Sequence, residues 1–172
     1  MEEITSENQF AFTKGRQILD CVLIANEAID YVKRLNLEGV VFKVDFQRAY
    51  DTISWDFLDL MLTKFGFGDR WRKWLQSCIS TASISILING SPTDNFRIQR
   101  GLRQGCPLSP LIYNIVAEGL SLVLAKASKA RFFSGVKIGS EDLEVTHLQF
   151  ADDLIIFSGA SFSEICNIKR IM

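Results

Sequence analysis

Aspartates interrupt two apolar, strand-like runs of this sequence. Asp45 lies within residues 40–46, and Asp152 and Asp153 stand side by side within FADDLIIF, residues 150–157. Strand propensity disfavours aspartate in both runs. A carboxylate near the end of a strand that is buried on both faces is costly unless it is paired or bound to a cation. The pattern therefore predicts that Asp45 has a partner.

The adjacent aspartates predict the tip of a hairpin. Aspartate tolerates turn conformations, so a harmless exposed pair is one interpretation. If the tip lies beside the end of the first strand, three carboxylates meet, and a divalent cation would offset their repulsion. Oxygen donors without histidine or cysteine suit Mg²⁺ or Mn²⁺ rather than zinc. Two such ions about 3.5–4 Å apart would support in-line phosphoryl transfer, the chemistry of nucleotidyl transfer.

A loop with closely spaced glycines, GLRQGCPLSP at residues 101–110, precedes a helical apolar pattern. Ser109 and Pro110 form a common pair at a helix start, so an ordinary loop is one interpretation. In the functional interpretation, small residues let the backbone approach a nucleotide or template, and Arg103 and Gln104 offer hydrogen-bond donors. The glycines alone are a weak indication.

Interleaved helices and strands must position these residues. Apolar spacing predicts a helix over residues 17–35, followed by the buried strand at 40–46. Ser54 predicts the N-cap of a helix ending at Gly66, with Asp51 and Asp56 near its dipole. The other expected elements are a helix from Asp69 with Trp71 and Trp74 in the core, a hairpin turning at Asn89 and Gly90, a strand at 95–99, a helix from Ser109 to about Lys126, and strands at 135–138, 143–150 and 154–157. This order predicts an α+β fold with a mostly antiparallel sheet packed on helices.

Composition narrows the class of protein. With 172 residues, 48% hydrophobic and 23% charged, the chain predicts one packed domain over residues 1–172. The net charge of −1 gives no bulk indication of a nucleic-acid partner, and the single histidine, His147, argues against mechanisms built on a histidine base. The unbroken apolar runs are far shorter than a membrane span, and the acidic start does not resemble a secretory signal. Four widely separated cysteines favour free thiols in an intracellular protein.

Four ordered motifs resemble the reverse transcriptase of plant LINE-type (non-LTR) retrotransposons. They are QFAFTKGRQILD (9–20), VVFKVDFQRAYDTISW (40–55), RGLRQGCPLSPLIYN (100–114) and HLQFADDLIIFS (147–158). The resemblance covers about residues 9–159. It implies a reverse-transcriptase-like palm with part of the fingers and no thumb, and hence a truncated domain.

The resemblance also assigns roles to residues. It makes Asp45, Asp152 and Asp153 the catalytic metal ligands, together with the main-chain carbonyl of Phe46. Tyr50 matches the aromatic residue that stacks under the nucleotide sugar, although the residues alone favour a core aromatic. The remaining matches are Gln104 and Gly105, which would contact the incoming nucleotide, and Arg103, Pro107 and Ser109, in the loop that shapes the template and nucleotide pocket.

The function that the resemblance implies is RNA-directed DNA polymerisation. Its cofactors would be two Mg²⁺ or Mn²⁺ ions, and its partners an RNA template, a DNA primer and deoxynucleoside triphosphates, in the cytoplasm or nucleus and without a membrane. Three alternatives remain open at this point: a catalytically inert remnant of a retroelement, a protein resembling group II intron maturases, and an unrelated metal-binding or structural α+β domain.

Overall fold

The structure is a computed structural model that describes residues 4–139 and 143–172. Its elements, in chain order, are α1 (Ile18–Arg34), β1 (Gly39–Asp45), α2 (Trp55–Lys64), α3 (Asp69–Ser80), β2 (Ser83–Ile84), β3 (Leu87–Ile88), β4 (Ser91–Pro92), β5 (Phe96–Arg97), α4 (Ser109–Lys129), β6 (Val136–Ile138), β7 (Leu143–Val145), β8 (His147–Phe150), β9 (Asp153–Gly159) and α5 (Phe162–Ile171). All named strand pairs are antiparallel, which confirms the α+β prediction.

The chain divides into two compact units. The first joins residues Met1–Gln47 to residues Ala117–Met172, and the second comprises Arg48–Val116. Helix α4 begins in the second unit and continues into the first.

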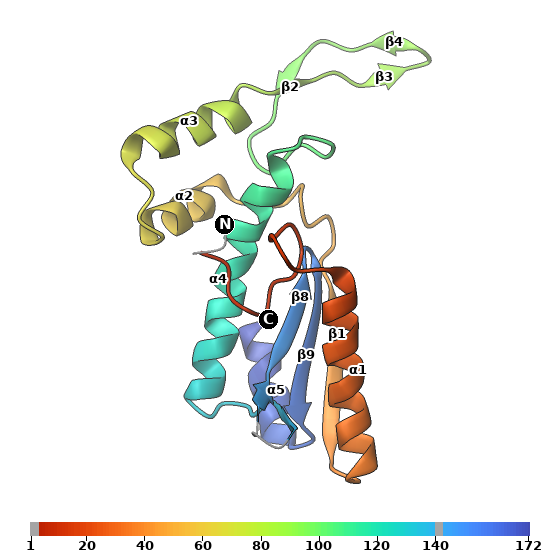
Figure 1. Cartoon of the computed structure of the whole chain (residues 1–172). Helices are drawn as coiled ribbons and strands as arrows, with labels where there is room; N and C mark the ends of the chain where they lie inside the picture. Colours follow the sequence, from red (N-terminus) through yellow and green to blue (C-terminus); the bar gives the residue numbers. More distant parts are fainter. Residues whose placement is uncertain (1–3, 140–142) are drawn as a thin grey trace. The chain divides into compact units, whose positions relative to one another are not determined.

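The first unit is built on a three-stranded sheet in the order β1-β9-β8 (Figure 1). On one face, small residues of α1, such as Ala25 and Ala28, pack with Leu148 and Phe157. On the other face, α4 and α5 cover Leu154 and Ile156 of β9. Alternate residues of β9 thus face opposite helical layers, as the strand period of two requires. The sheet is held from both sides.

Strand β1 differs from its sequence-based prediction. The sequence predicts a strand buried on both faces, but β1 lies at the edge of the sheet, and its residues alternate between exposed and half-buried. The half-buried Phe42 and Val44 contact the α4 and α5 side, whereas Lys43 and Asp45 are exposed. Burial therefore does not force Asp45 to have a partner, and the prediction of a strand buried on both faces was wrong.

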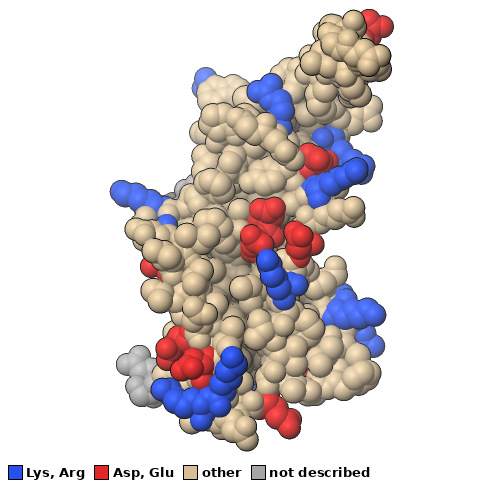
Figure 2. Space-filling model, turned by 90° about the vertical axis from the view of Figure 1, so that its right-hand side faces the viewer, with Lys and Arg blue, Asp and Glu red and all other residues tan. Residues whose placement is uncertain are grey.

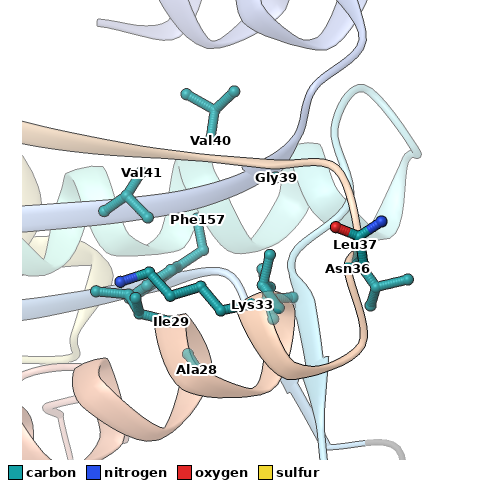
Figure 3. A pocket seen from close by; sticks show the side chains of 11 residues that line it. Ala28, Ile29, Lys33, Asn36, Leu37, Gly39, Val40, Val41 and Phe157 are labelled. Carbon is teal, nitrogen blue, oxygen red and sulfur yellow. The ribbon is translucent and has the colours of Figure 1, made fainter.

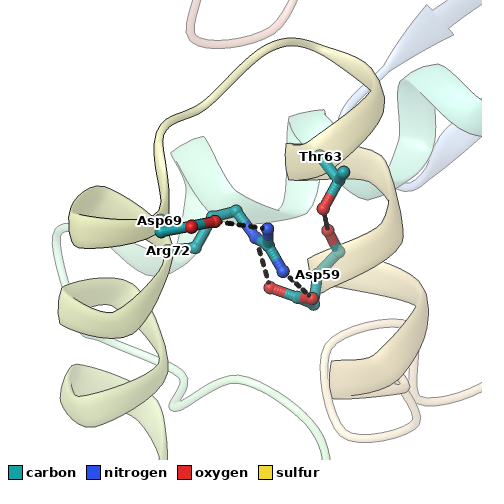
Figure 4. A network of polar contacts seen from close by, with 4 residues as sticks. All are labelled: Asp59, Thr63, Asp69 and Arg72. Carbon is teal, nitrogen blue, oxygen red and sulfur yellow. Dashed lines mark hydrogen bonds and ion pairs between the residues drawn. The ribbon is translucent and has the colours of Figure 1, made fainter.

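In the second unit, helices α2 and α3 are linked by a polar network (Figure 4). The Arg72 guanidinium donates to both carboxylate oxygens of Asp59 and also contacts Asp69 at 3.0 Å. The hydrogen bond from Arg72 lowers the pKa of Asp59. At the start of α2, the Ser54 side chain accepts the Phe57 amide, which confirms the predicted N-cap.

The sequence predicts that Trp71 and Trp74 of α3 lie in the core and that the following hairpin turns at Asn89 and Gly90. Trp71 and Trp74 are 54% and 52% exposed, so they are not core residues, and Arg70 lies 4.6 Å above the Trp74 ring. Asn89 and Gly90 both have positive φ, as a two-residue hairpin turn of type I′ requires, and they join β3 to β4 as predicted.

Helix α4 agrees with its prediction from Ser109 to about Lys126, whereas helix α5 was not predicted. Helix α4 is long and apolar enough to cross a bilayer by length and composition alone, although half of its most apolar stretch is buried, as in core helices. It also carries the buried Glu118, whose carboxylate accepts the Ser6 amide at 3.0 Å. Helix α5 was missed, although Ser161 and Glu164 have the spacing of a capping box.

Candidate active site

The sheet register places the aspartates at one end of the first unit. Asp45, the last residue of β1, is the direct cross-strand partner of Asp153, the first residue of β9. Directly opposed side chains in an antiparallel pair have Cβ atoms about 4.5–5.5 Å apart. Asp152 precedes Asp153 in the turn from β8, where Phe150 pairs with Asp153. The structure thus brings Asp45 to the adjacent pair Asp152 and Asp153, which is far from it in the sequence.

The carboxylate end is open to solvent and includes the ammonium group of Lys43. Asp45 is exposed, and the Asp153 side chain is 64% exposed. Lys43, two residues before Asp45 and on the same face of β1, places its Nζ 3.9 Å from Asp153 Oδ1. Sequence reasoning overlooked this lysine. An ion pair this exposed contributes on the order of 0–1 kcal/mol, so it does not satisfy the negative charge.

The carboxylates lie at the same end of the sheet but do not form a preformed metal site. Among residues 4–139 and 143–172, no group of three His, Cys, Asp or Glu side chains is arranged to hold an ion. The donor set itself fits a hard divalent cation, because every side-chain ligand would be a carboxylate oxygen. Like charges on directly opposed strand positions are destabilising, which favours binding of a cation between Asp45 and Asp153.

Two neighbours complete this end of the sheet. Cys21 of α1 is buried, and desolvation raises the pKa of its thiol, with a further contribution from the nearby Asp153 carboxylate. Phe46, the other expected metal contact, follows β1 and packs its ring against the apolar cluster of α4, α5 and β9. The ring therefore fixes the backbone that carries the Phe46 carbonyl.

The turn between β8 and β9 rests on two glutamines that motif reasoning overlooked. Gln9 and Gln149 are both 1% exposed, and the side chains of both hydrogen-bond to the backbone of Ala151, the first residue of the turn. The sequence gives one indication of this role, because the side-chain amide of Gln9, within the apolar QFAF segment, needs a hydrogen-bond partner when it is buried.

Of the expected nucleotide-binding residues, Tyr50, Gln104 and Gly105 lie in the second unit, whereas Phe46 lies in the first. The Tyr50 ring stacks on Tyr113 of α4, with 4.7 Å between ring centroids and 21° between ring planes. The Tyr50 carbonyl accepts the Leu102 amide at 2.7 Å. Tyr50 is therefore held by a ring partner and by the glycine-containing loop, so both the core and the functional interpretations of this residue keep a structural basis.

Gly101 brings that loop against the chain segment after Tyr50. Its amide donates to the Ile53 carbonyl at 2.8 Å, and its carbonyl accepts the Trp55 indole at 2.9 Å. Its φ is +81°, and a Cβ at this position would lie 2.5 Å from the Asp51 carbonyl oxygen. Only glycine fits this close approach.

The rest of the loop is ordered by local hydrogen bonds. Gln104 donates to the Asp51 carboxylate at 3.4 Å, so Asp51 contacts the loop, whereas Asp56 lies in the first turn of α2 as expected. The Ser109 hydroxyl donates to the Arg103 carbonyl at 2.6 Å instead of capping α4.

Two more loop positions have defined geometry. Gly105 has a φ of +80° with open space around the position of a Cβ, and Pro107 stands between it and α4. Between these two residues, a hydrogen bond from the Leu108 amide lowers the pKa of the Cys106 thiol.

The first unit also contains an apolar cavity, which lies away from the candidate site. This cavity of about 420 Å³ lies between the end of α1 and the strands β1 and β9, lined by residues such as Ile29, Lys33, Val41 and Phe157 (Figure 3). It reaches Gly39, at the opposite end of β1 from Asp45. The candidate site is therefore defined by the carboxylates and not by this cavity.

Sequence comparison identifies relatives over most of the chain. The protein-family model for reverse transcriptase (RNA-dependent DNA polymerase) matches residues 1–170. The 149 kDa protein of transposon TX1 of Xenopus laevis is 27% identical over 156 residues, which are 91% of this chain and 12% of that protein. The Pol polyprotein of the type-1 retrotransposable element R2 of Popillia japonica is 32% identical over 130 residues, 73% of this chain and 20% of that protein. The chain thus spans a small part of these relatives.

Structure comparison supports the same fold. Telomerase from Candida albicans, in complex with a TWJ fragment of telomeric RNA, aligns with a TM-score of 0.66 and 12% identity, covering 99% of this chain and 29% of that one. Apo telomerase from Candida tropicalis, truncated from its C-terminal domain, aligns with a TM-score of 0.64 and 15% identity, over 95% of this chain and 32% of that one. Identities this low support the fold alone. The family match over nearly the whole chain shows that this chain belongs to the reverse transcriptase family.

Proposed function

We propose that this chain is the palm, with part of the fingers, of the RNA-directed DNA polymerase of a plant LINE-type (non-LTR) retrotransposon. One observation carries the proposal: Asp45 and Asp153 are direct cross-strand partners, with Asp152 in the adjoining turn. It supports the proposal because three carboxylates, whose oxygens would suit a hard cation, lie at one end of a sheet in a chain of this family. Relatives from the TX1 and R2 elements support assignment to non-LTR elements.

The protein's own residues would bind and orient the reactants. Asp45, Asp152 and Asp153, with the Phe46 carbonyl, would hold two Mg²⁺ or Mn²⁺ ions. When bound, such ions activate the primer 3′-hydroxyl and stabilise the leaving pyrophosphate. Because this chemistry needs no covalent intermediate on the protein, the side chains act by positioning and charge neutralisation.

The loop residues would select and seat the nucleotide. The flat face of Tyr50, supported by Tyr113, would lie under the sugar of a deoxynucleoside triphosphate. Gln104 and Gly105 would contact the incoming nucleotide, and Arg103, Pro107 and Ser109 would shape the pocket around it and the RNA template. Templated DNA synthesis on an RNA strand is the activity that this arrangement supports best.

The direct test is primer extension on an RNA template with Mg²⁺ or Mn²⁺. We expect extension by the wild-type chain and a loss of about 10³-fold or more in the Asp152→Asn, Asp153→Asn double variant, because charge stabilisation by the metal ligands is removed. Asp30→Asn is the matched control, since Asp30 is an exposed aspartate on α1, and it should retain full activity. If the folded wild-type chain and the double variant are equally inactive, the proposed activity of this chain is wrong.

A further inference from the structure

The two-residue turn that carries Asp152 has an unusual backbone. Phe150 and Asp153 are paired across β8 and β9, so Ala151 and Asp152 alone form the connection. Ala151 has a φ of +53°, a conformation that is uncommon for residues other than glycine. Such a conformation persists when the surrounding structure holds it in place.

Buried glutamines supply this support. Gln9 Oε1 accepts the backbone amides of both Ala151, at 3.1 Å, and Ala11, at 3.0 Å. Gln149 Nε2 donates to the Ala151 carbonyl at 3.2 Å. Both polar groups of the Ala151 backbone are therefore bonded to side chains that are 1% exposed. Because both partners of the Gln9 side chain are amide donors, its oxygen must face them.

The segment that carries Gln9 is itself fixed beside β8. The Gln149 amide donates to the Asn8 carbonyl at 2.7 Å, and the Phe10 amide donates to the Gln149 carbonyl at 2.9 Å. These bonds form a short parallel bridge between Gln9 and Gln149. The Arg16 guanidinium donates to the Gln9 carbonyl from the other side. The side chain of Gln9 thus projects from a rigid support and not from a free N-terminal strand.

We propose that Gln9, assisted by Gln149, is a positioning residue that sets the direction of the Asp152 and Asp153 carboxylates by fixing the backbone of Ala151. The inference rests on the proposed function, because it assigns these carboxylates to divalent cations. Gln9 accepts a hydrogen bond from the Ala151 amide and acts through the main chain. Residues that orient metal ligands in this way contribute about 10-fold to 100-fold to metal affinity in other proteins.

The test measures Mn²⁺ affinity of the full chain by electron paramagnetic resonance of the free ion. Gln9→Met keeps the length of the side chain but removes the acceptor, and we expect it to weaken Mn²⁺ binding about tenfold or more. Gln9→Glu keeps an acceptor oxygen and should restore the affinity to within about threefold of the wild-type value. Ser158→Ala is the stability control, because it removes a hydrogen bond from the buried Ser158 to Glu164 near the opposite end of β9. It should lower the melting temperature and leave Mn²⁺ affinity unchanged.

The outcomes separate this inference from the proposed function. If the wild-type chain binds Mn²⁺, the Asp152→Asn, Asp153→Asn variant does not, and folded Gln9→Met binds it as the wild type does, only the positioning role is overturned. Absence of Mn²⁺ binding by the wild-type chain overturns the proposed function and this inference with it. If Gln9→Met does not fold, amide exchange in the wild-type chain decides. If the Ala151 amide is as protected from exchange as the Ile156 amide of β9, the positioning role of Gln9 is supported. Rapid exchange of the Ala151 amide overturns that role.

Discussion

Gly101 shows how one residue fixes the loop that would contact the nucleotide. Its positive φ and the 2.5 Å approach of a Cβ to the Asp51 carbonyl oxygen act together. Loss of this geometry would move Gly101 away from Ile53 and Trp55, both of which hydrogen-bond to it. The glycines of this loop are a weak indication in the sequence, and the structure shows that this one is required by a close contact.

We therefore predict that Gly101→Ala lowers the free energy of unfolding of the Arg48–Val116 unit by about 2–3 kcal/mol. Gly66→Ala is the matched control, because Gly66 also has a positive φ, +81°, but open space around it. It should cost only about 1 kcal/mol. Tryptophan fluorescence during urea unfolding measures both, since Trp55, Trp71 and Trp74 all lie in this unit. Equal losses in the two variants would show that the close contact has no effect.

At the scale of elements, β8 and α4 are joined by a buried polar chain. His147 of β8 is fully buried, and its Nε2 lies 2.8 Å from the Ser121 hydroxyl of α4. The Thr146 hydroxyl lies 2.9 Å from Nδ1. The Ser121 hydroxyl also contacts Ser6 at 2.9 Å, which ties the N-terminal segment to the same helix. The single histidine thus has a structural role.

Burial lowers the pKa of His147 from 6.5 to about 4, which predicts a pH dependence of stability. The unfolded chain takes up a proton below about pH 6.5, whereas the folded chain stays neutral down to about pH 4. Stability is therefore lost as pH falls through this window, by at most roughly 3 kcal/mol. Burial raises the pKa of Glu118, which acts in the opposite direction.

Comparison with His147→Gln isolates the contribution of the histidine. The difference in free energy of unfolding between the two proteins should shrink as pH falls from about 6.5 to 4, because only the wild-type chain loses stability through this group. Urea unfolding at a series of pH values measures it. A difference that stays constant across the window would contradict the neutral, buried state of His147.

The whole molecule consists of two units with different parts of the proposed chemistry. The carboxylates belong to the unit of Met1–Gln47 and Ala117–Met172, and Tyr50 and the glycine-containing loop belong to Arg48–Val116. On the face drawn in Figure 2, Lys and Arg side chains are interspersed with Asp and Glu, as the net charge of −1 implies. If a template binds this face, binding would therefore depend on local contacts more than on a broad basic surface.

Separate units predict separate opening reactions. A destabilising change in one unit should leave the other unaffected: Ser158→Ala should speed amide exchange in β1 and β9 without shifting the tryptophan fluorescence transition. Gly101→Ala should shift the tryptophan fluorescence transition without speeding amide exchange in β1 and β9. Hydrogen exchange measured by NMR in dilute denaturant distinguishes the units residue by residue. Coincident shifts of both probes in both variants would show one cooperative domain, which is what the sequence predicts for residues 1–172.

The sequence by itself determined most of the local structure and the chemical character of the site. Helices α1, α2 and α3 and the turn at Asn89 and Gly90 follow from apolar spacing, caps and turn residues, which act within a few positions of the chain. The ordered motifs were sufficient to indicate the family. Apolar spacing did not determine exposure: Trp71 and Trp74 lie on the predicted stripe but are half-exposed, because the surface that a stripe packs against is set elsewhere in the chain.

Only the tertiary structure decided which strands are neighbours and what lies beneath the candidate site. The pairing of Asp45 with Asp153 and the edge position of β1 depend on contacts between distant segments. The same holds for Gln9 and Ala151, which are 142 positions apart and meet through a hydrogen bond. Periodicity reports which face of an element is apolar, but the partner of that face is a property of the packed chain.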